Sequence, residues 1–364
     1  MTREPGPISL SRGEWEVSYA GFQTFLKLPI CLTPEDLRVG KIDVAVGGIP
    51  WDGTQATRSG TNLGPMHIRM ADHLWGNFEG RPHLHTRVDP FEHLKMADYG
   101  DAQILPGAID LSFANMKSFV GDILAGGAIP IILGGDHAIT WPNVTAMAEH
   151  YGYGKIGVVH FDAHADTAPV MPGQLTSHGA PMRQLIESGA VKGRNFVQVG
   201  LRGYWPGKDV VQWMEDQEMR THFMAEIQRH GFSTVLDRAI DEAMDGTPEH
   251  LFLSVDVDVC DPAFAPGTGS PEPGGLTSRE LLWAVRRLAA EVGIVGMDVV
   301  EVSPPYDVGN NITALLAHRI VLEAMTGIAM RKAGIVDRDY LDPRAADGPP
   351  PLASQPLASQ PLAQ

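Results

Sequence analysis

A short stretch of the chain carries three side chains that could hold a metal ion. Val158–Asp166 reads Val-Val-His-Phe-Asp-Ala-His-Ala-Asp, which places Asp162, His164 and Asp166 at alternate positions behind an apolar run. In an extended backbone alternate side chains share one face, so we expect two carboxylates and one imidazole to converge. Carboxylates held together away from water are costly unless their charge is offset, and a divalent cation is the usual answer. The alternative is a polar loop with one capping aspartate.

Two further stretches end in side chains of the same kind. Leu251–Val259 reads Leu-Phe-Leu-Ser-Val-Asp-Val-Asp-Val, an alternation that predicts a strand with Asp256 and Asp258 on one face. Ile129–His137 reads Ile-Pro-Ile-Ile-Leu-Gly-Gly-Asp-His, an apolar run followed by a glycine break, an acid and an imidazole. A strand alone would explain the apolar run but not the chemistry at its end.

Together the three stretches supply two imidazoles and four carboxylates: His137, Asp162, His164, Asp166, Asp256 and Asp258. This is more than one structural zinc ion takes, because zinc prefers four ligands rich in cysteine or histidine. Shared between two ions with bridging carboxylates, the set fits. Hard oxygen donors with one imidazole per ion suit Mn²⁺, and Ni²⁺ or Co²⁺ could compete because affinity rises along that series.

The rest of the chain alternates between strand-like and helix-like patterns. Further strands are predicted at 42–46, 96–101, 196–201 and 294–300, and helices at 111–125, 140–151, 209–230, 235–244 and 314–330. This alternation predicts an α/β fold with a mostly parallel central sheet covered on both faces. Ligand loops of such sheets lie at the carboxyl edge of the strands, where all three stretches end.

The composition excludes several classes of protein. Of the 364 residues, 43% are hydrophobic, enough for a large core, and the formal charge is −16. That charge disfavours nucleic acid and anionic membranes and favours a cationic substrate, although it also serves ordinary solubility. Only Cys31 and Cys260 are present, so a reducing cytoplasm fits. We see no signal peptide and no apolar run of about 18 residues, and expect a soluble, cytoplasmic protein.

We divide the chain into three parts. Residues 1–18 are polar and form an N-terminal arm, and residues 19–335 form one domain. Residues 336–364 contain the repeat Pro-Leu-Ala-Ser-Gln and are too polar and proline-rich to pack, so we expect a disordered and dispensable tail.

The three motifs together resemble those of the ureohydrolase family, which includes arginase and agmatinase. They are Gly-Gly-Asp-His at 134–137, Asp-Ala-His-Ala-Asp at 162–166 and Ser-Val-Asp-Val-Asp at 254–258, and the similarity extends from Tyr19 to Met330. The resemblance implies an arginase-like three-layer α/β/α sandwich and two divalent ions, Mn²⁺ or Ni²⁺. The first ion would be held by His137, Asp162, Asp166 and Asp256, and the second by His164, Asp162, Asp256 and Asp258, with Asp162 and Asp256 bridging.

The resemblance also implies a reaction. A water activated by the two cations attacks the guanidinium carbon, and the intermediate collapses to urea and an amine. His178, in Ser-His-Gly, would be the proton shuttle, and Glu301 would pair with the guanidinium, whose planar fork matches a carboxylate. Asp166 would accept a proton from the attacking water. The alternative for His178 is a surface histidine on a loop, and the alternative for Glu301 is a helix-capping acid.

The substrate is expected to be a small cationic guanidino compound. Thr167–Met171 is mostly apolar where arginases carry polar groups that hold an amino-acid head, so arginine is not expected. The chain looks closer to the agmatinase branch, near guanidinobutyrase, guanidine hydrolase and metformin hydrolase, which suggests an agmatine-like compound, guanidine, an alkylguanidine or a biguanide. Two departures from the family, Trp51 for Phe and Ala180 for Thr, add bulk or remove polarity near the pocket. Trp51 and Met171 either line the pocket with Glu301 or serve packing.

The resemblance implies an oligomer, because relatives are commonly trimers or hexamers. A homo-oligomer is expected, with a hetero-oligomer as the alternative, in which this chain is a catalytically silent structural subunit beside a paralogue. The complete set of six ligands, together with His178 and Glu301, argues against a silent subunit. A metal-sensing protein of the same fold is a third class that no residue pattern supports.

Overall fold

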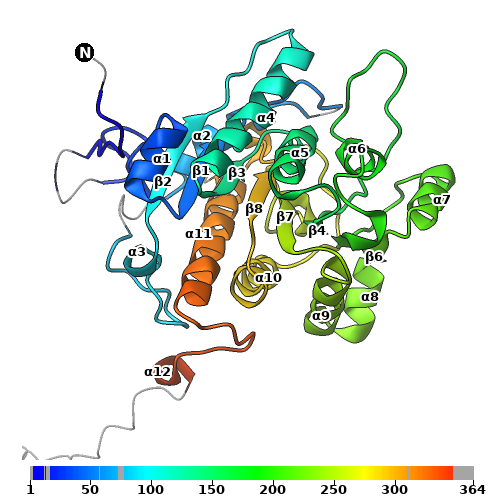
Figure 1. Ribbon diagram of the computed structural model, residues 1–364. Helices are drawn as coiled ribbons and strands as arrows, with labels where there is room; N and C mark the ends of the chain where they lie inside the picture. The colour runs from blue at the N-terminus through cyan, green and yellow to red at the C-terminus, as the bar shows by residue number, and fades with distance from the viewer. Residues whose placement is uncertain are drawn as a thin grey trace, which may run out of the picture.

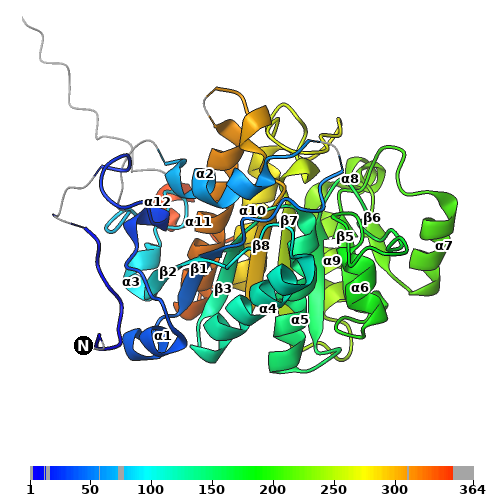
Figure 2. The ribbon, with the colours of Figure 1, turned by 90° about the horizontal axis from the view of Figure 1, so that it is seen from above.

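Eight strands form one parallel sheet, and helices cover both of its faces (Figures 1 and 2). The computed structural model describes residues 3–11, 13, 17–56, 58–72, 78–309 and 311–346. Every pair of neighbouring strands in the sheet runs parallel. The predicted three-layer α/β/α sandwich is therefore confirmed, and its central sheet is parallel throughout.

The strands are β1 (Val44–Gly48), β2 (Met96–Asp101), β3 (Ile129–Leu133), β4 (Ile156–Phe161), β5 (Phe196–Val199), β6 (Arg220–His222), β7 (His250–Asp256) and β8 (Gly296–Val300). Their order across the sheet is β2-β1-β3-β8-β7-β4-β5-β6. The four central strands, β3, β8, β7 and β4, are almost entirely buried, which explains their nearly continuous apolar sequences. Because the strands are parallel, their carboxyl ends meet along one edge of the sheet.

The helices are α1 (Pro34–Gly40), α2 (Gly64–Met70), α3 (Pro90–His93), α4 (Ile109–Ala125), α5 (Thr140–Tyr151), α6 (Pro181–Glu187), α7 (Lys208–Asp216), α8 (Met224–His230), α9 (Phe232–Ala243), α10 (Ser278–Glu291), α11 (Ile312–Lys332) and α12 (Pro343–Ala346). Helices α1, α4, α5 and α6 cover one face, and α9, α10 and α11 cover the other (Figures 1 and 2). Side chains alternate between the two cores along each strand: in β3, Ile131 and Leu133 join one core and Ile132 joins the other.

Helix α11 corrects one expectation from the sequence. By length and composition alone it is apolar enough to span a membrane, but 72% of its most apolar window is buried inside the protein. It packs along α10, and a side chain in place of Gly327 would collide with the backbone carbonyl of Arg286. We read α11 as a core helix. The sequence predicted a helix over 314–330 but no apolar run of about 18 residues, because polar residues such as His318 and Arg319 interrupt it.

Two predicted elements also differ from the structure. The helix predicted over 209–230 is broken by the edge strand β6, which lies between α7 and α8. This strand is only three residues long and begins with Arg220, so its sequence has no strand-like alternation. The strand predicted over 251–259 ends at Asp256, and a 3-10 turn, Val257–Val259, follows.

The described part of the N-terminal segment packs against the domain. Ile8 pairs with Ile30 through backbone hydrogen bonds, and the Arg3 guanidinium contacts the Asp36 carboxylate at 2.6 Å. Most of the predicted tail, residues 347–364, lies outside the described residues. The division into arm, domain and tail stays a prediction.

Candidate metal-dependent active site

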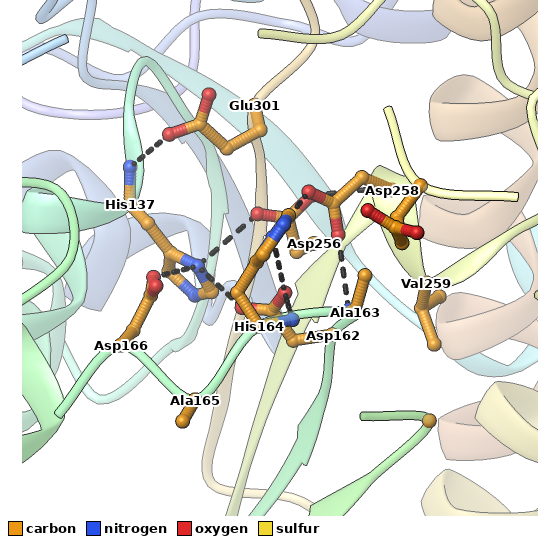
Figure 3. A network of polar contacts seen from close by, with 12 residues as sticks. His137, Asp162, Ala163, His164, Ala165, Asp166, Asp256, Asp258, Val259 and Glu301 are labelled. Carbon is orange, nitrogen blue, oxygen red and sulfur yellow. Dashed lines mark hydrogen bonds and ion pairs between the residues drawn. The ribbon is translucent and has the colours of Figure 1, made fainter. Parts of the chain in front are cut away.

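The predicted ligands lie together at the carboxyl edge of the four central strands (Figure 3). His137 opens a 3-10 turn shortly after β3, Asp162 follows β4 directly, Asp256 ends β7, and Glu301 follows β8. These strands are neighbours in the order β3-β8-β7-β4, so residues far apart in the chain become adjacent. The sheet order therefore brings the motifs into one site.

His137 is surrounded by carboxylates. Its Nδ1 lies 3.2 Å from Asp162 Oδ2, 2.9 Å from Asp166 Oδ2 and 3.2 Å from Asp256 Oδ2. The ring is fully buried, and despite these short distances Nδ1 has no partner with the geometry of a hydrogen bond among the described residues. Burial lowers the pKa of His137, but the three carboxylates raise it well above its usual value. A buried nitrogen facing three carboxylates is the donor set that a divalent cation satisfies.

A second group of donors surrounds His164. Its Nδ1 lies 3.0 Å from Asp258 Oδ2 and 3.5 Å from Asp162 Oδ1. Burial opposes protonation of His164, but the Asp258 and Asp162 carboxylates raise its pKa to about 12. Asp162 thus directs one oxygen to each histidine, as a carboxylate shared between two ions would. The pKa of Asp256 is raised, mainly by burial and also by repulsion from the Asp258 and Asp162 carboxylates. Because these conditions disfavour the charged carboxylate, positive charge is needed to stabilise the cluster.

The ligands converge by a route that the sequence did not predict. Strand β4 ends at Phe161, so Asp162, His164 and Asp166 lie in the following loop and not on one strand face. The loop turns because Asp162 Oδ1 accepts the backbone N–H of His164 at 2.6 Å and Asp166 has a positive φ of 50°. The alternation of the triplet therefore reflects a tight turn.

Asp256 ends strand β7 and Asp258 lies in the turn that follows, so this pair also does not share one strand face. Asp256 Oδ1 accepts the backbone N–H of Asp258 at 2.8 Å, which starts the 3-10 turn after β7. The Asp258 carboxylate in turn accepts the backbone N–H of Ala163 at 3.1 Å, which joins the two ligand loops. The alternation of Asp256 and Asp258 is thus a turn motif at the end of a strand.

His160 is a member of the cluster that sequence reasoning missed. It lies on β4, fully buried, with Nε2 2.9 Å from Asp162 Oδ2. Its Nδ1 lies 3.3 Å from the Gln198 amide nitrogen, which also donates to the carbonyl of Ala165. Although His137, His160 and Asp162 lie close enough to hold an ion, both nitrogens of His160 are engaged, so we assign it to orienting Asp162. The signal was present in the sequence, because His160 stands two residues before Asp162.

His137 is held from behind by a buried polar network. Its Nε2 lies 3.0 Å from Ser254 Oγ, and Ser254 donates to Asp298 Oδ1 at 2.8 Å. Thr140 and Asn143 both donate to Asp298 Oδ2 at 2.9 Å. Asp298 is fully buried on β8, and burial raises its pKa. This network fixes the ring of His137, and no motif in the sequence pointed to Asp298.

Glu301 and His178 face each other beside the cluster. Glu301 has a positive φ of 64°, its Oε1 accepts the backbone N–H of His137 at 2.9 Å, and this oxygen lies 3.6 Å from His178 Nδ1. Burial lowers the pKa of His178, but contact with Glu301 outweighs it and raises the pKa to about 9. Burial and the Glu301 charge also raise the pKa of Asp136 to about 7. The structure thus places Glu301 and His178 next to the predicted metal ligands.

The two remaining substrate candidates lie in different environments. The Trp51 ring is buried, meets Phe113 edge-on at 5.4 Å between ring centroids, and donates from Nε1 to Thr54 Oγ1 at 3.3 Å. Met171 is 66% exposed in the loop between β4 and α6. A substrate contact by either residue stays a prediction.

The comparisons with known proteins agree with this architecture. The family model described as Arginase family matches residues 42–327. The guanidinopropionase of Pseudomonas aeruginosa is 37% identical over 314 residues, which cover 85% of this chain and 93% of that protein. The guanidinobutyrase of the same organism is 35% identical over 308 residues, covering 84% and 92%.

Solved structures of the same fold are also similar. Proclavaminate amidino hydrolase from Streptomyces clavuligerus has a TM-score of 0.75 at 33% identity, covering 87% of this chain and 100% of that chain. A hypothetical agmatinase from Burkholderia thailandensis has a TM-score of 0.76 at 32% identity, covering 92% and 99%. The fold and the His–Asp cluster define a three-layer α/β/α protein with a candidate metal site. The chain belongs to the arginase family, and is a ureohydrolase.

Proposed function

We propose that the protein is a dinuclear metal hydrolase that cleaves a guanidinium C–N bond and releases urea and an amine. The observation that carries the proposal is the buried His137 Nδ1, which faces three carboxylates without a hydrogen-bond partner among the described residues. The group around His164 supplies the second set of donors. When bound, two divalent ions, Mn²⁺ or Ni²⁺, supply a nucleophile from water at neutral pH.

Three side chains have the chemistry that the remaining steps need. The Glu301 carboxylate pairs with the planar guanidinium of the substrate and orients the guanidinium carbon toward the His–Asp cluster. Asp166, beside His137, accepts a proton from the attacking water. His178 is protonated at neutral pH because its pKa is raised to about 9, so it donates the proton that the leaving amine requires.

The substrate we propose is a small guanidino compound without an amino-acid head: agmatine-like, guanidine, an alkylguanidine or a biguanide. Relatives of the chain include proteins named guanidinopropionase, guanidinobutyrase and agmatinase. The loop after the ligand triplet, Thr167–Met171, is mostly apolar and offers little to an α-amino acid head group. Trp51 and Met171 are the proposed side chains that shape the pocket for the substituent.

We further propose a homo-oligomer, a trimer or a hexamer, located in the cytoplasm. The alternative, a catalytically silent subunit beside a paralogue, is less well supported because the ligands, His178 and Glu301 are all present and brought together. A light-scattering measurement of mass on the protein purified alone separates three or six copies from a chain that needs a partner.

The test is a urea-release screen on protein loaded with Mn²⁺ or Ni²⁺, over agmatine, guanidinobutyrate, guanidine, methylguanidines and metformin. We expect one compound to release urea, and Asp256→Asn to lose bound metal and at least about a hundredfold in rate, because it removes a shared ligand. If no compound gave urea with metal bound, the catalytic proposal would fail and the silent-subunit alternative would stand.

A further inference from the structure

The loop after β1 reaches the site through a residue that the family motifs do not include. Gln55 Nε2 donates a hydrogen bond to Glu301 Oε2, while Gln55 Oε1 is buried without a hydrogen-bond partner among the described residues. An unpaired buried oxygen is unfavourable, so each such group needs an explanation. Among the described residues the Gln55 side-chain amide forms one hydrogen bond, and that bond is to the carboxylate proposed to bind the substrate.

The orientation of this amide follows from its partner. A carboxylate can only accept hydrogen bonds, so the NH₂ group and not the carbonyl of Gln55 must face Glu301. The loop itself is held in place, because Thr54 donates to Asp136 Oδ2 from its backbone N–H at 3.0 Å and from Oγ1 at 2.7 Å. The contact is therefore built from a fixed loop.

Gly269 closes the other side of the contact. A Cβ at this position would lie 2.6 Å from Gln55 Nε2 and 3.1 Å from Glu301 Oε2. Both distances are shorter than ordinary van der Waals contact, so a side chain here would displace the amide from the carboxylate. Gly269 thus provides an independent way to disturb the same contact.

The chemistry of the donor suits a cationic substrate. Glu301 Oε1 accepts from the backbone N–H of His137 and lies 3.6 Å from His178 Nδ1, whereas Oε2 accepts from Gln55, a neutral donor. A lysine or arginine in place of Gln55 would hold the carboxylate equally well but would cancel its charge and repel a guanidinium. A neutral amide fixes Oε2 without adding a second positive charge to that of His178, and so preserves negative charge for the substrate.

We propose that Gln55 is a positioning residue, which orients Glu301 for the guanidinium of the substrate without neutralising it. The inference rests on the proposed function, because it takes Glu301 as the substrate-binding carboxylate. Loss of the Gln55 donor leaves Glu301 held at one oxygen only, which weakens substrate binding more than the chemical step and leaves the metal ligands untouched.

The test compares Gln55→Met and Gly269→Ala with the wild type by steady-state urea release and by calorimetric binding of agmatine. We expect each variant to lose about 10- to 100-fold in kcat/KM, mostly through KM, with unchanged metal content, because the lost bond is to a charged group. The matched control is Gln212→Met, since Gln212 donates to the Asp216 carboxylate at 3.0 Å on the exposed face of α7. This control should behave as wild type.

The outcomes separate the two proposals. If KM and the agmatine dissociation constant of both variants stay within twofold of wild type, the positioning role is wrong. A loss that appears in kcat alone, or together with lost metal, also overturns it, because a general structural defect produces that pattern. If wild type releases no urea but agmatine binds more weakly to Gln55→Met, the proposed function fails while the positioning role stands.

Discussion

At the scale of single residues, His178 combines position with a suitable protonation state. Its Nδ1 lies 3.6 Å from Glu301 Oε1, and this contact raises its pKa to about 9 against the opposing effect of burial. A raised pKa keeps the proton on the ring at neutral pH, and the protonated form is lost as pH rises through about 9. A proton donor for a leaving amine needs this behaviour.

The first prediction is that His178→Asn lowers kcat by about 100-fold or more, because general acid catalysis by a positioned side chain is lost. In the wild type, kcat should also fall as pH rises through about 9, and this alkaline limb should be absent in the variant. The measurement is kcat against pH for both proteins. An alkaline limb that persists unchanged in His178→Asn would assign the titration to another group.

At the scale of elements, Asp298 ties a helix and two strands together under the site. From β8 it accepts hydrogen bonds from Ser254 on β7 and from Thr140 and Asn143 on α5. Ser254 Oγ in turn lies within hydrogen-bond distance of Nε2 of His137, the predicted metal ligand after β3. Packing of these elements and orientation of a ligand therefore depend on the same buried carboxylate.

The second prediction concerns Asp298→Ala, which leaves three buried donors without their acceptor. We expect the free energy of unfolding to fall by about 3 kcal/mol and metal affinity by about 10- to 100-fold, because both the packing and the ligand orientation are lost. Chemical denaturation and metal titration measure the two effects. Asp245→Ala, at an exposed ion pair with Arg194, is the control and should change neither quantity measurably.

Sequence patterns predicted long elements better than short ones. The apolar runs of β3, β4 and β7 and the helix α4 were recognisable because burial imposes their composition. The edge strand β6 was missed, since three residues, of which His222 alone is buried, are too few to carry a periodic signal. The ligand turn after β4 was read as strand, because a turn and a strand both allow side chains two residues apart to share a direction.

At the scale of the whole molecule, the protein is acidic, and repulsion between negative charges is strongest at the site. The chain carries a formal charge of −16, and four carboxylates meet at one edge of the sheet: Asp162, Asp166, Asp256 and Asp258. Of these, Asp256 and Asp258 have raised pKa values because burial and neighbouring acids disfavour their charged forms. Cations at the site would relieve this repulsion in the folded state only.

The third prediction is that removal of metal by a chelator lowers the melting temperature by about 5 °C, and that Mn²⁺ or Ni²⁺ restores it. A ligand at about 100 times its dissociation constant that binds only the folded state stabilises it by about 2.7 kcal/mol. Differential scanning calorimetry of the chelated and reloaded protein measures the shift. An identical melting temperature with and without metal would contradict the predicted site.

By itself, the sequence determined the class of fold, the family and the identity of the candidate ligands. These are local properties, since each motif carries its donors within a few residues of an apolar run. Only the tertiary structure decided that His160 and Asp298 support the ligands and that Gln55 holds Glu301. Those contacts depend on which strands lie side by side and how each loop turns after its strand, and long-range packing sets both.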